Sequence, residues 1–567
     1  MRKSGAEILW ECLVREGVDL VFGIPGGAIM PVYDTMLNYP VRHILTRHEQ
    51  GAAHMADGYA RASGKVGVAM ATSGPGATNL VTGIATAMMD SSPIVCITGQ
   101  VPIQLVGGDA FQEVDMTGIT LPVTKHNYLI ASASEVAEVV REAFYIARSG
   151  RPGPVLIDFC KNAQVEEVEF EYPEELALPG YKPPTHAPQA DLRKAVELIE
   201  TAKRPVILAG HGVLMSGAVD ELQMFAVKTQ TPVAMTLLGL GAIPASHPLS
   251  LDMMGMHGEA YSNLAIQNAD LVLAFGMRFD DRVTGNLKNY APNAKKIHIE
   301  IDPSEVHKNV WVDLPLVGDL KTVLSDLIPM VDEYDHEEWM DQISEWRLES
   351  QQLDILHWPR DGKLYTARVV HDIWEETGGD EIIATGVGQH QMWAAQYYKF
   401  EQPYRLITSG GAGTMGFGLP SAIGAWFAHP ECNVWVIDGD GSFQMTQAEL
   451  STAAYAGANV KIAIMNNNFL GMVRQWQEFF FESRYAGTPL NNPDFCTIAQ
   501  AHGIPSRCIT VSDEVKPAIE FAKETSGPVL LEFKVEMEEA VYPMVPTGAP
   551  LHEMIRRPDR RSPAAEE

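Results

Sequence analysis

Residues 434–468 read VWVIDGDGSFQMTQAELSTAAYAGANVKIAIMNNN, and this stretch decides how the rest of the chain is organised. The apolar runs Val434 to Ile437 and Val460 to Met465 each predict a buried strand. Between them, the turn Asp438 to Gly441 precedes a segment, Thr446 to Ala456, whose apolar residues recur at helical spacing. Strand, helix and strand form a βαβ crossover, so we expect the two strands to be parallel neighbours.

Both predicted strands end in side chains that carry oxygen, Asp440 after the first and Asn467 after the second. Parallel neighbours end at the same edge of a sheet, and a carboxylate beside an amide leaves octahedral positions around Mg²⁺ open for phosphate oxygens. Gly439 and Gly441 let the backbone approach a phosphate, and the helix that opens after Ser442 offers free N–H groups. A Gly-Asp-Gly turn alone is common, but its spacing to the Asn run favours a diphosphate–metal site. The pattern resembles the thiamine diphosphate signature.

Composition narrows the class of protein. The chain of 567 residues is too long for one core and predicts three or four domains. Its 42 basic and 72 acidic residues give a net charge of −30, which argues against nucleic acid or an anionic membrane as a partner. The six cysteines are scattered with no Cys-x-x-Cys pair, as in reduced cytosolic proteins. No apolar run reaches membrane-spanning length and no signal peptide is recognisable, so we expect a soluble cytoplasmic protein.

Helix, short strand and glycine turn alternate in three parts of the chain, for example at Leu20 to Gly23, Pro205 to Gly210 and Glu381 to Gly386. This alternation predicts an α/β fold with three doubly wound parallel-sheet domains. We expect a first domain over residues 1–165, a linker over 166–189, a central domain over 190–345, a linker over 346–364, a third domain over 365–545 and a C-terminal tail over 546–567. The tail has no core periodicity, which favours a disordered end over a flap that covers a site.

Eight segments match one enzyme family in order along the chain: Phe22 to Gly27, Arg47 to Gly51, Ser73 to Asn79, Gly107 to Asp115, Arg278 to Gly285, Gly386 to Trp393, Gly413 to Pro420 and Gly439 to Trp476. On these segments the chain resembles the catalytic subunits of acetohydroxyacid synthase (acetolactate synthase), a thiamine diphosphate-dependent family, over nearly its whole length. So many ordered matches make the resemblance highly specific. It implies domains that bind, in order, the pyrimidine of the cofactor, a flavin and the diphosphate.

Glu49 is the candidate for a catalytic carboxyl group. Small residues, Gly51, Ala52, Ala53 and Ala56, follow it and leave little to solvate its charge. From this context alone, a glutamate in the first turn of a helix needs no further explanation, because the helix macrodipole favours it. The resemblance implies that Glu49 is the glutamate that activates the aminopyrimidine of thiamine diphosphate.

The resemblance also implies a set of residues that contact thiamine diphosphate. They are Gly26, Gly74, Asn79, Val387, Gly388, Gln389, His390, Gly413, Met415, Gly439, Asp440, Gly441, Ser442, Asn467, Phe469, Gly471 and Met472. Val387 and Met415 would enforce the bent cofactor, although a lone Val or Met is usually a core residue. Mg²⁺ would be held by Asp440, Asn467 and the backbone carbonyl of Phe469, where some relatives have a polar residue.

A flavin, FAD, is implied by a second set: Arg151, Gly210, Gly212, His257, Gly276, Arg278, Asp302 and Asp319. Taken alone, the loop Arg278 to Arg282 is typical of a solvated ion-pair cluster. An acidic residue after a strand is also a common position for holding a ribose hydroxyl. The chain has no redox cysteine pair, and the resemblance implies that FAD is structural and carries no electrons.

Four residues resemble the lining of the family's substrate channel: Phe111, Gln112, Lys125 and Trp476, together with Arg278, which faces the second 2-oxo acid. A tryptophan that narrows the acceptor pocket would favour the ethyl group of 2-oxobutanoate over the methyl group of pyruvate. One methylene is worth about 1–3 kcal/mol, so we expect preference and not exclusion.

The function implied by the resemblance is decarboxylation of pyruvate on thiamine diphosphate and transfer of the hydroxyethyl unit to a second pyruvate or to 2-oxobutanoate. The products, 2-acetolactate and 2-aceto-2-hydroxybutanoate, lead to valine, leucine and isoleucine. The family also implies a homodimer or homotetramer, with a dimer as the smallest active unit, and a small regulatory subunit. Three alternatives are a pyruvate oxidase-type flavin enzyme, a flavin-free catabolic acetolactate synthase and a non-catalytic regulatory paralogue.

Overall fold

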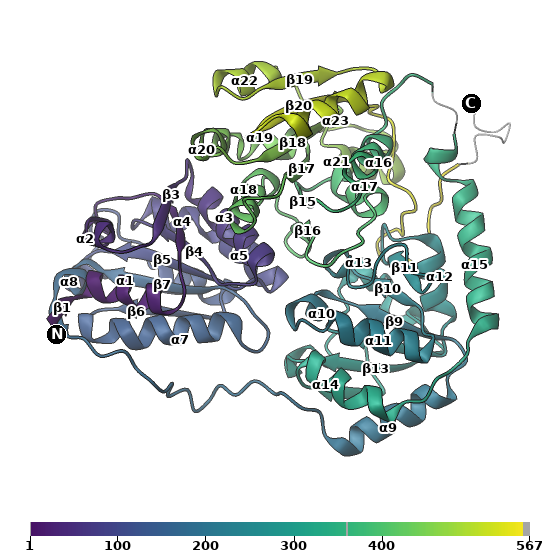
Figure 1. The fold of residues 1–567 in the computed structure, drawn as a ribbon, viewed down its shortest axis with the longest axis horizontal. Helices are drawn as coiled ribbons and strands as arrows, with labels where there is room; N and C mark the ends of the chain where they lie inside the picture. The colour runs from purple at the N-terminus through teal and green to yellow at the C-terminus, as the bar shows by residue number, and fades with distance from the viewer. Residues whose placement is uncertain (1, 359–360, 559–567) are drawn as a thin grey trace.

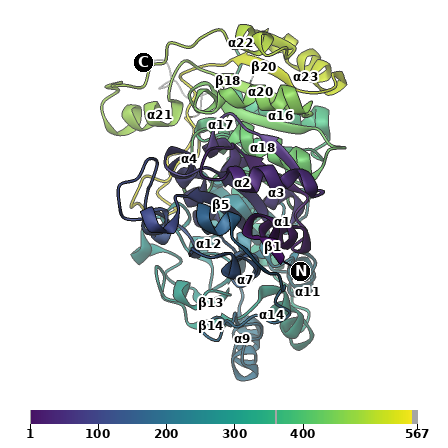
Figure 2. The ribbon, with the colours of Figure 1, turned by 90° about the vertical axis from the view of Figure 1, so that its left-hand side faces the viewer.

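The structure, a computed structural model, describes residues 2–358 and 361–558. Three six-stranded sheets, each with parallel pairing throughout, form three α/β domains. In Figure 1 the first domain lies at the left, the third at the top and the central one below it on the right. Figure 2, turned by 90°, shows the first domain in front, between the other two. The fold class predicted from the sequence is therefore confirmed.

The first domain has the strand order β3-β2-β4-β5-β7-β6. Its strands are β2 (Leu20–Gly23), β3 (Arg42–Leu45), β4 (Gly67–Ala71), β5 (Ile94–Gln100), β6 (His126–Ile130) and β7 (Val155–Cys160). Its helices are α1 (Gly5–Arg15), α2 (Met30–Thr35), α3 (Glu49–Ser63), α4 (Pro75–Asn79), α5 (Val81–Asp90), α6 (Met116–Thr120), α7 (Val136–Arg148) and α8 (Lys161–Val165). Every residue of β4, β5 and β7 is buried, because helices cover both faces of a parallel sheet.

The central domain has the strand order β11-β10-β9-β12-β13-β14. Its strands are β9 (Pro205–Ala209), β10 (Val233–Met235), β11 (Ser250–Met253), β12 (Leu271–Phe275), β13 (Lys295–Glu300) and β14 (Leu314–Val317). Its helices are α9 (Gln189–Thr201), α10 (His211–Met215), α11 (Val219–Thr229), α12 (Ala260–Asn268), α13 (Asp281–Thr284), α14 (Leu320–Leu327) and α15 (Glu337–Gln352). Numbered within the domain, this order is 3-2-1-4-5-6, the order of dinucleotide-binding sheets.

The third domain has the strand order β16-β15-β17-β18-β20-β19, the same pattern as the first domain. Its strands are β15 (Ile382–Thr385), β16 (Leu406–Ile407), β17 (Val434–Gly439), β18 (Val460–Asn466), β19 (Ser506–Ile509) and β20 (Val529–Lys534). Its helices are α16 (Thr366–Thr377), α17 (Gln389–Tyr397), α18 (Gly418–Ala428), α19 (Asp440–Gln444), α20 (Leu450–Ala456), α21 (Gly471–Phe480), α22 (Phe495–Ala501) and α23 (Val515–Glu524).

The βαβ unit predicted from residues 434–468 is present. Strands β17 and β18 pair in parallel from Val434↔Val460 to Gly439↔Met465, and both are fully buried. The connection differs in one respect from the expected turn followed by one helix. Helix α19 begins directly at Asp440, and a 3₁₀ turn, Gln447–Glu449, separates it from α20. The Gly-Asp-Gly segment is therefore the junction of a strand and a helix.

The first and third domains are joined by close packing of α3 against α18. Gly58 and Gly424 make this approach possible, because a Cβ atom at Gly58 would lie 2.0 Å from the carbonyl oxygen of Ser421 and one at Gly424 would lie 1.9 Å from that of Met55. Alanines of both helices join one hydrophobic cluster, including Ala52, Ala56 and Ala422. The two domains are thus fixed against each other within one chain.

The segments outside the three sheets also pack on the domains. Strand β8 (Glu167–Glu169) pairs antiparallel with β1 (Arg2–Ser4), and residues 170–188 then run without helix or strand to the central domain, along the bottom of Figure 1. In the C-terminal segment, Met544 and Ile555 form an isolated antiparallel β-bridge, and Leu551 is buried. The carbonyl oxygen of Ala549 accepts a hydrogen bond from the backbone N–H of Asn286 at 3.0 Å. The expectation of a disordered tail is wrong for residues 546–558, since these apolar contacts anchor the segment; the rest of the tail lies outside the described residues.

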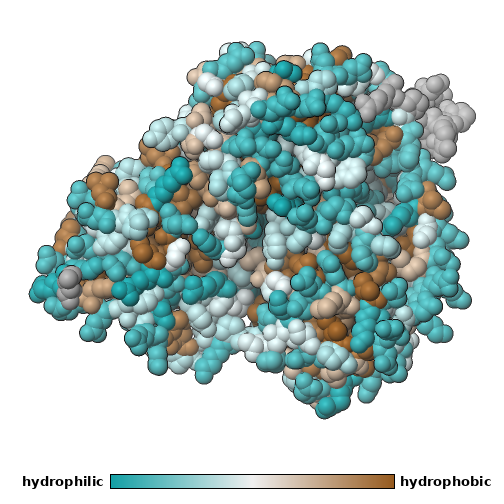
Figure 3. All heavy atoms as spheres, viewed as in Figure 1, coloured by the Kyte–Doolittle hydropathy of each residue, from teal (hydrophilic) through white to brown (hydrophobic). Residues whose placement is uncertain are grey.

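The surface is consistent with the acidic composition. The face in Figure 3 is largely hydrophilic, with apolar groups scattered over the first and central domains. No helix among the described residues is long and apolar enough to cross a membrane.

Candidate active site between the domains

A cavity of about 940 Å³ lies between the central and third domains. Short stretches of the first domain, Met89 to Ser91 and Gly150 to Pro152, also line it. Many of the residues expected to contact a cofactor or substrate form its wall: Val387, Gly388, Gln389, His390, Gly413, Met415, Gly439, Asp440, Gly441, Ser442, Asn467, Phe469, Gly471, Met472, Trp476, Arg151, Gly210, Gly212, His257, Gly276, Arg278 and Asp319. One cavity is therefore lined by most of the set expected for thiamine diphosphate and by most of the set expected for a flavin.

The proposed metal ligands lie at the carboxyl ends of β17 and β18. Asp440 starts α19, and the Asn467 side chain is held in place because its Oδ1 accepts a hydrogen bond from the backbone N–H of Phe469 at 3.0 Å. Asp440 is 2% exposed and Asn467 9% exposed, and burial raises the pKa of Asp440 to about 6. A bound divalent cation would favour the charged form of this carboxyl group. The pair can supply one carboxylate and one amide oxygen from adjacent strand ends, which suits Mg²⁺.

The glycines at this end of the cavity leave room that any side chain would fill. A Cβ atom at Gly439 would lie 2.6 Å from His390 Nδ1, and one at Gly471 would lie 2.2 Å from Gln389 Oε1. Nε2 of His390 is buried, 3.5 Å from Asp438 Oδ1, and has no hydrogen-bond partner among the described residues. Burial lowers the pKa of His390 to about 3, so its ring is neutral and can donate one hydrogen bond. Closely approaching backbone beside a neutral histidine fits a diphosphate.

Loops before α18 and α17 form the opposite wall. The hydroxyl oxygen of Ser442 accepts hydrogen bonds from Val387 N at 3.3 Å and Gly416 N at 3.0 Å, which ties these loops to the start of α19. Gly413 has φ +63°, a conformation that favours glycine, and Met415 lines the cavity beside it. Val387 and Met415 are half-buried and face the cavity, so they can act as its apolar wall.

Two charged residues that the sequence did not single out support the loop at Gly410 and Gly411. The carboxylate of Asp90 accepts hydrogen bonds from the N–H groups of Gly411 at 2.6 Å and Gly410 at 3.0 Å. Arg61 pairs with Asp90 at 2.9 Å and donates to the carbonyl oxygen of Thr408 at 2.7 Å. Both charges are buried and fully paired, so the first domain holds the wall of the cavity through hydrogen bonds.

The expected residues of the first domain form a separate group. Asn79 Nδ2 donates to Glu49 Oε2 at 2.9 Å, and Glu49 is 9% exposed. A Cβ atom at Gly26 would meet Thr72 at 2.5 Å, and one at Gly74, where φ is +60°, would meet Gln112 at 2.9 Å. None of these described residues lines the cavity. Within one chain, the structure therefore does not bring Glu49 to the cavity that contains Asp440.

The set expected for a flavin surrounds the carboxyl ends of β9 and β12. Gly212 N donates to the carbonyl oxygen of Gly276 at 2.9 Å, and a Cβ atom at Gly210 would lie 2.2 Å from that oxygen. Since the strand order reverses between β9 and β12, this crevice is where a dinucleotide binds in such sheets. His257 Nδ1 is buried without a hydrogen-bond partner among the described residues. Close backbone approach and an unused polar atom fit FAD.

The acidic members of this set have different roles. Asp302 does not line the cavity, but Arg151, which does, lies 3.5 Å from its Oδ2 and donates to Glu305 at 2.7 Å. Asp319 lines the cavity and caps α14 by accepting from Thr322 N at 3.0 Å. The structure also adds Glu300, whose pKa burial raises to about 7, to the lining of this region.

The residues expected in the substrate channel are divided between the two groups. Trp476 lines the cavity from α21, with its ring 5.4 Å from that of Phe480. Phe111 is 88% exposed and Gln112 has φ +58°, both in the first domain and away from the cavity. Lys125 Nζ donates to the carbonyl oxygens of Ile146 and Ser149, and burial lowers its pKa to about 8. The ammonium group of Lys125 is thus occupied within its own domain.

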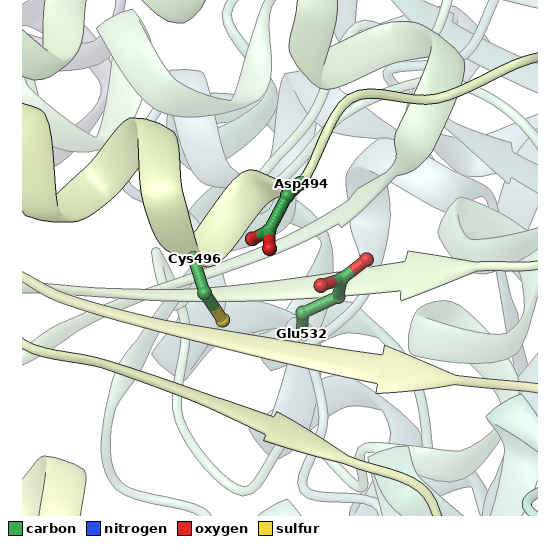
Figure 4. Close-up of side chains that lie close together, drawn as sticks. All are labelled: Asp494, Cys496 and Glu532. Carbon is green, nitrogen blue, oxygen red and sulfur yellow. The ribbon is translucent and has the colours of Figure 1, made fainter.

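A second acidic cluster lies elsewhere in the third domain. Figure 4 shows Asp494, Cys496 and Glu532 with their ligand atoms close together, all within 4.8 Å of one another. Glu532 already accepts a hydrogen bond from Asn466 at 2.7 Å and pairs with Lys534, while Asp494 caps α22. Because both carboxylates are satisfied by the protein, this cluster is a weaker candidate for Mg²⁺ than the cavity.

Models of the thiamine pyrophosphate enzyme family match parts of all three domains. Family models describe the N-terminal binding domain of thiamine pyrophosphate enzymes over residues 3–119, their central domain over 192–327 and their C-terminal binding domain over 386–533. The acetolactate synthase large subunit of Corynebacterium glutamicum is 47% identical over 566 residues, with 97% of this chain and 89% of the relative covered.

Relatives in other organisms are nearly as similar. A probable acetolactate synthase large subunit of Methanocaldococcus jannaschii is 46% identical, covering 98% of this chain and 95% of the relative. The acetolactate synthase large subunit of Haemophilus influenzae is 43% identical, covering 97% and 98%. Each of these matches covers almost the entire chain and therefore includes all three domains. The chain therefore belongs to the acetolactate synthase large-subunit family of thiamine pyrophosphate enzymes.

Proposed function

We propose that this protein is a catalytic acetolactate synthase. It decarboxylates one pyruvate and joins the remaining two-carbon unit to a second 2-oxo acid, so that two pyruvates and one proton give 2-acetolactate and carbon dioxide. With 2-oxobutanoate as the acceptor, the product is 2-aceto-2-hydroxybutanoate. One observation carries the proposal: Asp440 and Asn467 line the same cavity as Gly210 and Gly276, which form the dinucleotide-type crevice. The products place the enzyme in branched-chain amino-acid biosynthesis.

The third domain would hold thiamine diphosphate and Mg²⁺. Asp440, Asn467 and the Phe469 carbonyl would bind the cation, and the glycines at 439 and 441 would admit the diphosphate. Thiamine diphosphate, when bound, supplies the carbanion chemistry that decarboxylation and ligation require. Val387 and Met415 would fix its conformation and exclude water from the reacting end. His390 would remain neutral and donate a hydrogen bond to an anionic oxygen.

The central domain would hold FAD as a structural group. Backbone approach at Gly210, Gly212 and Gly276 supports this role, and Arg278 at the cavity wall can bind the carboxylate of the second 2-oxo acid. Six cysteines are present, and none of the described ones forms a disulfide. FAD would not transfer electrons in this reaction, because carboligation is redox-neutral.

Glu49 would act on thiamine diphosphate held by another copy of the chain. Its side chain is buried and accepts a hydrogen bond from Asn79, yet it does not line the cavity of its own chain. Two chains that exchange these surfaces would form two complete sites, which makes a homodimer the smallest active unit and permits a homotetramer. A small regulatory subunit would be a further partner, as the large-subunit names of the relatives imply, and the protein would work in the cytoplasm.

Purified protein tests this function. Its visible spectrum should show bound flavin, and pyruvate with thiamine diphosphate and Mg²⁺ should give acetolactate, measured as acetoin after acid decarboxylation. Under anaerobic conditions, turnover should continue without stoichiometric bleaching of the flavin. Bleaching would instead identify a pyruvate oxidase-type enzyme, and the absence of product would identify a non-catalytic paralogue. Catalysis by flavin-free protein would favour the catabolic alternative.

A further inference from the structure

A series of hydrogen bonds between side chains connects a buried carboxylate on β20 to Asp440. Glu532 Oε1 accepts from Asn466 Nδ2 at 2.7 Å, and Asn466 Oδ1 accepts from Asn492 Nδ2 at 3.0 Å. The same nitrogen of Asn492 donates to Asp440 Oδ2 at 2.6 Å. The links connect β20, β18, a loop and the start of α19, so four separate elements define the position of one carboxylate.

Two features fix the orientation of Asn492. Gln444 donates to Asn492 Oδ1 at 2.9 Å and to the carbonyl oxygen of Asp440 at 3.0 Å, so the nitrogen end of the Asn492 amide faces Asp440. The loop itself is tied to the end of β18, because Leu490 N donates to the carbonyl oxygen of Asn468 at 2.8 Å. Asn492 therefore acts as a donor toward Asp440, and its own oxygen is already engaged.

Glu532, one of the three residues in Figure 4, is the outer end of this series of hydrogen bonds. Glu532 is 2% exposed and receives hydrogen bonds from Asn466 and from the ammonium group of Lys534. Its carboxylate is thus committed to orienting Asn466, whose oxygen then receives the Asn492 amide. Asn466 is itself 1% exposed, so this link is shielded from water.

We propose that Asn492 is a positioning residue that holds the Asp440 carboxylate ready for the divalent cation. The inference rests on the proposed function, in which Asp440 is a metal ligand. Carboxylate ligands are commonly oriented by outer hydrogen bonds, and loss of such a partner typically weakens metal binding about 10–100-fold. Asn492 Nδ2 donates to Asp440 Oδ2, and this bond would hold the carboxylate in one orientation for a cation.

Binding of Mn²⁺ to the full-length protein tests this role without an activity assay. Free Mn²⁺ is counted by electron paramagnetic resonance in the presence of saturating thiamine diphosphate. Asn492→Ala should raise the Mn²⁺ dissociation constant about 10–100-fold. Asn492→Asp has the same shape but cannot donate, so it should also bind Mn²⁺ more weakly. The neighbouring exposed residue provides the control, since Asn491→Ala should match the wild type.

The outcomes separate this inference from the proposed function. If the wild type binds no Mn²⁺, the metal site itself is wrong. If the wild type binds Mn²⁺ and Asn492→Ala binds it equally well, the positioning role is wrong. Tighter binding by Asn492→Asp would make residue 492 a direct ligand and would also overturn the proposal. Should a residue-492 variant fail to fold, Gln444→Ala removes the bond that orients the amide, and unchanged Mn²⁺ affinity in that variant would contradict the proposal.

Discussion

The first and third domains share a strand order but present their predicted cofactor residues in different surroundings. In the third domain, Asp440 and Asn467 form part of the wall of a cavity that extends to the central domain. In the first domain, Glu49 lies outside that cavity and Phe111 is 88% exposed. Among the described residues, the third-domain set lines this cavity, whereas Gly26, Glu49, Gly74 and Asn79 do not.

This difference bears on the proposed homodimer. Close packing of α3 on α18 fixes the two domains within a chain, so a hinge motion that carries Glu49 to Asp440 would have to separate buried helices. Such a separation would expose a large apolar surface to water, at about 25 cal/mol for each Å². Pairing with a second chain needs no such cost.

The largest effect is expected for the third-domain set. Asp440→Ala removes the sole carboxylate proposed to contact the cation, so binding of Mg²⁺ and thiamine diphosphate should be lost while the fold is retained. Isothermal titration measures both ligands, and circular dichroism checks the fold. Asp494→Ala, in the second acidic cluster of the same domain, is the matched control and should bind normally. Normal activity of Asp440→Ala at low Mg²⁺ would refute the anchoring role.

The next effect concerns the first-domain set. Glu49→Gln keeps the shape and the hydrogen bond to Asn79 but cannot transfer a proton, so turnover should fall about 10²–10⁴-fold. Binding of thiamine diphosphate should change far less, because the diphosphate is held by the other domain. Hydrogen–deuterium exchange at the reactive carbon of bound thiamine diphosphate, read by NMR after acid quenching, isolates this step. Exchange at the wild-type rate would remove Glu49 from the mechanism.

Mixing the two inactive variants tests whether the sets come from different chains. Random dimers of Glu49→Gln and Asp440→Ala chains contain one intact site in half of the molecules, so about a quarter of wild-type activity should return. The chains are mixed after mild dissociation, and activity is followed during reassembly. No recovery despite verified exchange of chains would show that each chain supplies both sets itself.

The sequence predicted the fold where buried strands are continuous. Strands β17 and β18 are fully buried and mainly apolar, with Asp438, Lys461 and Asn466 as the polar exceptions. Since parallel strands end at one edge of a sheet, both the βαβ unit and its polar end could be predicted. The C-terminal segment was misjudged because its apolar residues lie outside any helix or strand and therefore show no period. Val545 and Leu551 are buried in a hydrophobic cluster with residues of the central domain, which local sequence does not reveal.

For the site, what could be predicted depends on sequence distance. Glycines at strand ends indicate close backbone approach and could be identified from the sequence. Asn492 could not, because it contacts Asp440 from 52 residues away in sequence, through a loop that folds back on the end of β18. Its sequence, two asparagines before Pro493, is typical of a turn. Likewise, Arg61 and Asp90 look like helix-surface charges until the third domain packs over them. Long-range polar contacts of this kind carry no local pattern.

The smallest effect is expected for acceptor choice. Trp476 is half-buried on α21 and lines the cavity, so its indole can cover the extra methylene of 2-oxobutanoate and leave a gap beside pyruvate. Covering one methylene is worth about 1–3 kcal/mol, so Trp476→Leu should lower the preference for 2-oxobutanoate roughly tenfold. Phe479→Leu, on the same helix and outside the cavity lining, is the control. A competition assay with both 2-oxo acids gives the product ratio directly. If Trp476→Leu lowers both products in parallel, the tryptophan supports the fold of α21, and the acceptor preference must come from other residues of the cavity.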